Sequence, residues 1–179
     1  MKLSTLSILL GLGVSLPQLY GLLKPAAFRE KARQFPRSKT AGYLLMAVAT
    51  IWFLVNLNDE SISDFASYKR AMLLGFGALG VATCIYVSDF LAVRGLAIVL
   101  MLLAKLMLDT ARWVDSQWRL VIVVWAYLMI LAGMWFTISP WRARDLINWA
   151  TANEERIRVT SGIRLAFGVF ILLLGLTVF

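Results

Sequence analysis

The chain has 179 residues, 60% of them hydrophobic, and a mean hydropathy of +0.77. An ordinary soluble domain is only about 45–50% apolar. The additional apolar residues of this chain cannot all be buried in the core of a soluble domain of this size. The formal net charge is +8, but most Lys and Arg residues lie in a few segments between apolar runs, where they indicate membrane topology rather than nucleic-acid binding. Histidine is absent and Cys84 is the only cysteine, which excludes an intrachain disulfide, zinc sites and His-dependent catalysis.

The first predicted span runs from about Leu3 to Leu23, because this apolar run is long enough to cross the hydrocarbon layer as a helix. Its small residues Ser7, Gly11 and Ser15 recur four residues apart, a spacing that lets another helix approach closely. We therefore assign them to helix packing. Pro17 removes one backbone hydrogen bond, and we expect the helix to kink there.

A basic segment, KPAAFREKARQFPRSK over residues 24–39, separates the first two spans. Pro25 predicts the start of a short helix and Pro36 predicts its end. Apolar side chains recur within it at i, i+4 and i+7, and basic residues fill the rest of the helical wheel, which indicates an amphipathic helix in the membrane interface. The interfacial candidates in this segment are Phe28, Arg29, Arg33 and Phe35.

The second span is expected over about Thr40 to Leu57, and the connection that follows it is acidic. The third span covers about Lys69 to Ser88 and contains GFGALG, residues 75–80, which matches the G-x-G-x-x-G pattern of dinucleotide-binding proteins. That pattern needs a strand before it and an acidic residue after it, and both are missing here. We interpret the small residues of this span as helix-packing positions: Ala71, Gly75, Ala78 and Ala82.

The fourth span, about Ala92 to Leu108, holds Lys105, the one charge clearly inside a span, and Asp109 follows one turn later. An ionisable group inside the membrane is a functional candidate by default. Lys105 and Asp109, together with the kink at Pro17, therefore form a candidate ion or substrate pathway. A structural alternative stays open, because Lys105 lies near the end of its helix and can reach the interface or pair with Asp109.

The fifth span covers about Leu120 to Ile138, and a second amphipathic helix is expected to begin at Pro140 after a cap at Ser139. Its interfacial candidates are Trp141 and Trp149. The sixth span runs from about Val159 to Phe179.

The distribution of basic residues predicts the orientation of these six spans. Twelve of the 18 Lys and Arg residues fall in or beside the first, third and fifth connections, and five fall on the other side. The positive-inside rule then places both amphipathic helices in the cytoplasm and both termini in the periplasm of a bacterial inner membrane.

The two ends of the chain resemble one another, and parts of them resemble two known groups of proteins. Residues 3–57 and 120–179 share a Pro-aromatic-Arg linker, which indicates a parallel hairpin repeat unless both simply follow the rules that bilayers impose. The stretch SPWRARDLINWATANEERIRVTSGIRLAFGVFILLL resembles small bacterial inner-membrane hairpin proteins of unknown function. SLPQLYGLL resembles the Pro-Gln motif of PQ-loop carriers, although no second Pro-Gln pair follows.

These observations predict an all-α fold: a polytopic transmembrane bundle of six spans with two short amphipathic helices, forming one integral membrane domain over residues 1–179. We expect no catalytic residue, metal or cofactor, and membrane lipids and other membrane subunits as partners, without nucleic acid. The leading interpretation is a non-catalytic accessory or scaffolding subunit of a larger membrane complex. The alternative is a small carrier or channel using Lys105 and Pro17, while a lipid enzyme would need a polar cluster that the sequence lacks.

Overall fold

The computed structural model describes residues 2–60, 63–87 and 89–179, and every regular element in these ranges is helical. The all-α prediction is therefore confirmed. The helices are α1 (Leu3–Leu23), α2 (Pro25–Gln34), η1 (Phe35–Arg37), α3 (Lys39–Asp59), η2 (Ser63–Tyr68), α4 (Lys69–Tyr86), α5 (Leu91–Ala111), α6 (Arg119–Ile138), α7 (Pro140–Ala150) and α8 (Glu154–Thr177).

Five of these helices, namely α1, α3, α5, α6 and α8, are long and apolar enough to cross a membrane. This property identifies the chain as a membrane protein of the helical class. The sequence predicted six spans, and α4 is the helix that falls outside the five. It has 18 residues and begins with Lys69 and Arg70, so its two charges lower the mean hydropathy of the whole helix.

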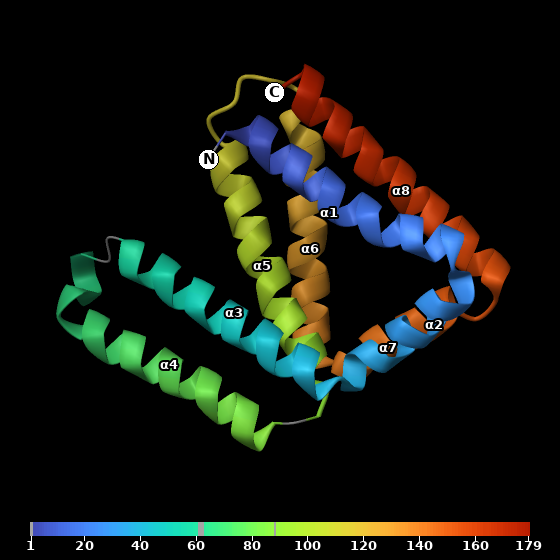
Figure 1. Cartoon of the computed structure of the whole chain (residues 1–179). Coiled ribbons are helices and arrows are strands. Elements are labelled where there is room, and N and C mark those ends of the chain that lie inside the picture. The colour runs from blue at the N-terminus through green and yellow to red at the C-terminus, as the bar shows by residue number, and fades with distance from the viewer. Residues whose placement is uncertain (1, 61–62, 88) are drawn as a thin grey trace.

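The long helices make three main pairwise contacts, two of which share α5 (Figure 1). α1 runs antiparallel to α8, α5 packs on α6, and α3 packs on α5. α2 and α7 lie beside each other across one end of the molecule and join the α1–α8 pair to the remaining helices. α4 lies at the edge of the molecule, and its main described contacts are with α3 and η2.

The buried core lies where the N-terminal part of α1 and the C-terminal part of α8 meet α5 and α6. It consists of aliphatic and small side chains, namely Leu3, Leu6, Leu10, Ala104, Met107, Ala111, Ile122, Ala126, Met129, Ile171 and Leu174. Both ends of the chain lie beside this core, so the first and last spans fix each other there (Figure 1).

Several helix boundaries differ from the sequence prediction for local reasons. α8 begins at Glu154, five residues before the predicted start at Val159, because Asn153 is extended and two acidic residues occupy the first turn, where the helix dipole favours them. At the start of α3, the Ser38 hydroxyl accepts a hydrogen bond from the Ala41 amide at 3.3 Å. α1 continues as one helix on both sides of Pro17.

Candidate functional site

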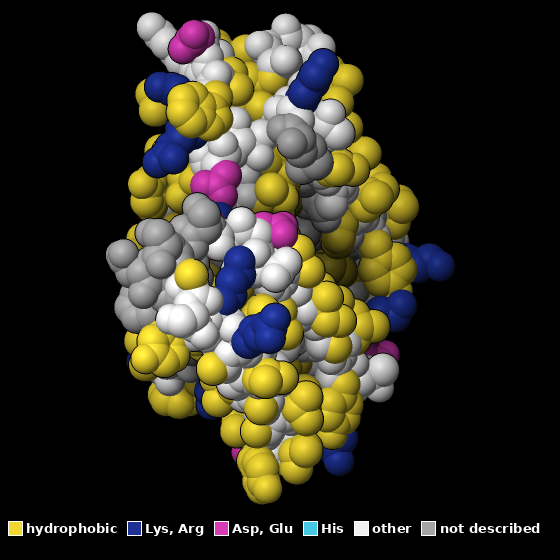
Figure 2. All heavy atoms as spheres, turned by 90° about the vertical axis from the view of Figure 1, so that its left-hand side faces the viewer, with side chains coloured by type: hydrophobic (Ala, Val, Ile, Leu, Met, Phe, Trp, Pro, Cys, Tyr) yellow, Lys and Arg dark blue, Asp and Glu magenta, His cyan; other side chains and the backbone are white. Residues whose placement is uncertain are grey.

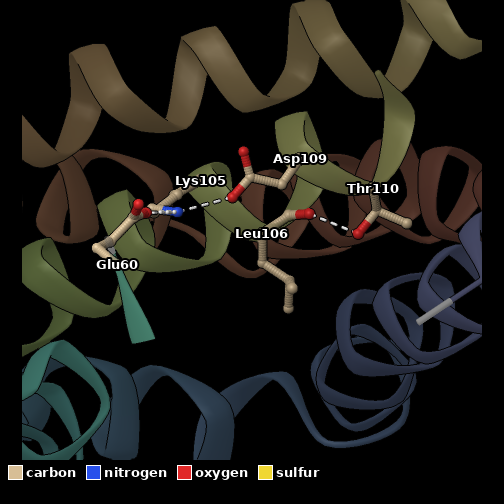
Figure 3. A network of polar contacts seen from close by, with 5 residues as sticks. All are labelled: Glu60, Lys105, Leu106, Asp109 and Thr110. Atoms are coloured by element: carbon tan, nitrogen blue, oxygen red, sulfur yellow. Dashed lines mark hydrogen bonds and ion pairs between the residues drawn. The ribbon is translucent and has the colours of Figure 1, made fainter. Parts of the chain in front are cut away.

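Lys105 lies on α5 between two carboxylates (Figure 3). Its Nζ is 2.8 Å from Oδ2 of Asp109, one turn further along α5, and 3.1 Å from Oε1 of Glu60, which follows the last residue of α3. The Lys105 side chain is 42% exposed and both carboxylates are 57% exposed. The group therefore joins the C-terminal parts of α3 and α5 as a partly exposed ion pair.

The structure brings Lys105 and Asp109 together but leaves Pro17 apart from them. Pro17 belongs to α1, and the described polar contacts of Lys105 involve only α5 and the end of α3. The amine is already neutralised by two carboxylates, so it has the geometry of a brace between helices. Glu60 was not among the predicted site residues, because it lies 45 positions from Lys105 and no local pattern relates the two.

Basic residues also bind backbone carbonyls at the C-terminal ends of α3 and α5. The Lys69 amine at the start of α4 donates to the carbonyls of Asn58 and Glu60 at the end of α3. Arg119, the first residue of α6, donates through Nη1 to the carbonyls of Arg112 and Val114, each at 3.1 Å. A cation at the C-terminal end of a helix offsets the negative end of its dipole, which stabilises both connections.

On the opposite end of the molecule, Arg33 of α2 holds the C-terminal end of α7. Its Nε donates to the Thr151 hydroxyl at 3.0 Å and its Nη2 donates to the Thr151 carbonyl, also at 3.0 Å. Thr151 is 3% exposed and caps α7. These two bonds link helices separated by more than a hundred residues.

The other interfacial candidates lie on or near this end. Phe28 contacts Tyr20 with the ring centroids 6.5 Å apart, and Phe35 begins η1 and is half-buried. Arg29 is half-buried, and its Nε has no hydrogen-bond partner among the described residues. Trp141 and Trp149 are largely exposed, and the Arg156 guanidinium lies 5.8 Å from the centre of the Trp149 ring.

The small residues of α1 lie directly against α8. A Cβ added to Gly11 would lie 2.7 Å from the Gly168 carbonyl oxygen, which is closer than real Cβ atoms approach. A Cβ at Gly175 of α8 would lie 2.9 Å from the Ser4 carbonyl oxygen. Ser7 and Ser15 are buried in the same interface. The two backbones therefore touch without intervening side chains.

The small residues of α4 lie in a different environment. A Cβ added to Gly75 meets nothing within 4 Å, Ala71 and Ala78 are exposed, and Ala82 is half-buried. No residue of α4 is buried in the chain. Seen from the side that α3 and α4 occupy, the lower part of the molecule presents mainly hydrophobic side chains, and most charged side chains facing the viewer lie above them (Figure 2).

The described residues contain no group of three or more His, Cys, Asp and Glu side chains able to hold a metal ion. Comparison of the chain with protein-family models, with curated proteins and with solved structures found no match.

Proposed function

We propose that the protein is a non-catalytic accessory or scaffolding subunit of a bacterial inner-membrane complex. The observation that carries this proposal is α4, an apolar helix with no buried residue and an exposed stripe of small residues formed by Ala71, Gly75 and Ala78. In α1 the same kind of stripe allows backbone contact with another helix. The stripe on α4 suits a transmembrane helix of a partner subunit.

The proposal includes six alternating spans, with α4 as the third. An 18-residue helix is about 27 Å long, close to the hydrocarbon thickness of about 30 Å. The start of α1 and the ends of α3, α5 and α8 lie toward one end of the molecule, while α2, α7 and the end of α4 lie toward the other (Figure 1). Six alternating spans produce this distribution.

The orientation within the membrane follows from charge. α2 and α7, as amphipathic interfacial helices, belong on the cytoplasmic face, and both termini belong in the periplasm. Two of the basic residues on the other face, Lys69 and Arg119, bind backbone carbonyls of the preceding connections. Membrane-impermeant thiol reagents test the orientation on a Cys84→Ser background: a cysteine at Ser116 should react in spheroplasts, and one at Arg37 only after the membrane is opened. The reverse pattern contradicts the orientation.

The alternative, a small carrier or channel, has weaker support from the geometry. It relied on an available charge at Lys105 near a kink at Pro17, and Lys105 instead pairs with Glu60 and Asp109. A carrier should lose transport in Lys105→Ala while assembling normally, whereas a scaffold should be indifferent to this substitution. Flux assays in liposomes that compare the wild type with this variant therefore separate the two.

The test of the accessory-subunit proposal compares bulky substitutions at two glycines. At both positions an added Cβ would meet nothing within 4 Å. Gly75→Leu places a large side chain on the exposed α4 stripe, and Gly13→Leu does the same on α1 outside the α8 contact. Each variant is purified from its native membrane in gentle detergent, and mass spectrometry quantifies the proteins that accompany it. We expect Gly75→Leu alone to lose stoichiometric subunits. Purification of the wild type without any subunit, or equal retention by both variants, refutes the proposal.

A further inference from the structure

A cleft of about 350 Å³ opens among α3, α4, α5 and α6, and its lining is almost entirely apolar. The one charged residue in the lining is Arg94. Cavities that bind small molecules have volumes of about 300–1,000 Å³ and combine mostly apolar walls with a few polar groups. This cleft fits that description, and none of the residues assigned above to helix braces or partner contact forms part of it.

Arg94 has no counter-charge in the described part of the chain. The side chain is half-buried, its Nε is buried without a hydrogen-bond partner, and no described hydrogen bond or ion pair includes it. A guanidinium held against apolar walls without an anion loses hydration and gains nothing in return. Arginine binds phosphate and carboxylate groups through two parallel hydrogen bonds, so an anionic group would satisfy it.

Three of the polar side chains that line the cleft lie at one end of the spans, and the fourth, Thr50, lies midway along α3. Arg94 is three residues from the start of α5, about 5 Å along the helix, and Thr83 and Thr137 lie in the last turns of α4 and α6. The opposite part of the lining includes Phe53 and Phe76, which contact each other with ring centroids 5.0 Å apart. Phe76 is ten residues from the end of α4, about 15 Å deeper in the membrane.

The charged end of the cleft lies near the end of the helices and its aromatic part lies deeper. A lipid in the bilayer is arranged in the same way, with its headgroup at the surface and its chain in the interior. We propose that the cleft binds an anionic phospholipid from the surrounding membrane, with the phosphate on Arg94 and one acyl chain against Phe53 and Phe76. The assignment rests on α3 to α6 crossing the membrane. It holds for either orientation and does not require the partner subunit proposed above.

The test uses purified full-length protein stripped of lipid in detergent. Thermal unfolding and native mass spectrometry are followed during titration with phosphatidylglycerol, with phosphatidylcholine of the same acyl chains, and with inorganic phosphate. The wild type should be stabilised by phosphatidylglycerol and retain one molecule of it, and should respond much less to the other two. Equal effects of both lipids, or a full effect of inorganic phosphate alone, overturn the proposal.

Three variants locate the site. Arg94→Gln should weaken phosphatidylglycerol binding by about tenfold or more, and Arg94→Lys should weaken it less, because it keeps the charge but not the paired hydrogen bonds. Leu79→Trp narrows the cleft from a side chain that is 61% exposed, and should weaken binding without disturbing the fold. Arg112→Gln, at the other end of α5, is the matched control and should bind as the wild type does.

Unchanged binding in both Arg94→Gln and Leu79→Trp overturns the proposal. If Arg94→Gln does not fold, two tests remain. These are the comparison of the two lipids on the wild type and the binding measured for Leu79→Trp.

Discussion

The substitution Gly11→Ala tests whether backbone contact between α1 and α8 holds the two ends of the chain together. The new methyl group would lie 2.7 Å from the Gly168 carbonyl oxygen and 2.8 Å from the Leu172 amide nitrogen, so one backbone must move. Overpacking of this kind costs about 1–3 kcal/mol. Alanine is also a better helix former than glycine by about 1 kcal/mol, which partly hides that cost.

Gly13→Ala removes this ambiguity, because a Cβ at Gly13 meets nothing within 4 Å and the helix is the same. The gain in helix propensity is common to both variants and cancels in their difference. We therefore expect Gly11→Ala to be less stable than Gly13→Ala by about 1–3 kcal/mol, or about 5- to 150-fold in the unfolding equilibrium constant.

Reversible unfolding by SDS in mixed micelles measures this difference. Trp125 of α6 contacts Phe167 of α8 edge to face at 5.0 Å, so tryptophan fluorescence reports on α8 leaving the bundle. Equal stability of the two glycine variants would show that the backbones of α1 and α8 do not touch at Gly11.

Two further predictions concern the polar braces. A double-mutant cycle with Lys105→Ala and Glu60→Gln should give a coupling energy of about 0.2–1 kcal/mol, because the ion pair is partly exposed. This coupling energy should fall as salt is added, and a coupling energy that does not change with salt contradicts the prediction. Arg33→Lys should destabilise the protein by about 1 kcal/mol, since lysine cannot form both bonds to Thr151, while Arg37→Lys should be neutral. Equal melting temperatures of these two variants would refute the Arg33 brace.

The positions of the helices followed from sequence because apolar runs and proline positions are local signals. α1 has the predicted bounds Leu3–Leu23, and α7 begins at Pro140 as expected. The assignment of α4 was less direct, since Lys69 and Arg70 bring its composition close to that of a non-spanning helix. The apolar run predicts where a helix forms, and charged residues at its ends lower its mean hydropathy, which weakens the prediction that it spans the membrane.

The pairing of the helices did not follow from sequence, because it depends on residues far apart in the chain. The spacing of Ser7 and Gly11 predicts that some helix comes close, but the complementary glycines, Gly168 and Gly175, lie in the last helix. The same spacing around Gly75 leads to an open face. A small-residue stripe therefore predicts close approach without identifying the partner helix.

The arrangement of α3 and α4 explains why the partner and lipid proposals can fail separately. α3 is fixed to α5 near one end, where a Cβ at Gly95 would lie 2.9 Å from the Met46 amide nitrogen, and near the other by the Lys105–Glu60 ion pair. α4 is attached mainly through α3. A side chain added at Gly75 meets none of these contacts, so Gly75→Leu should leave lipid binding intact. Arg94 lies on α5, so Arg94→Gln should leave the exposed α4 stripe unchanged. Loss of both properties in either variant would indicate instead that α4 moves as a unit with the cleft it lines.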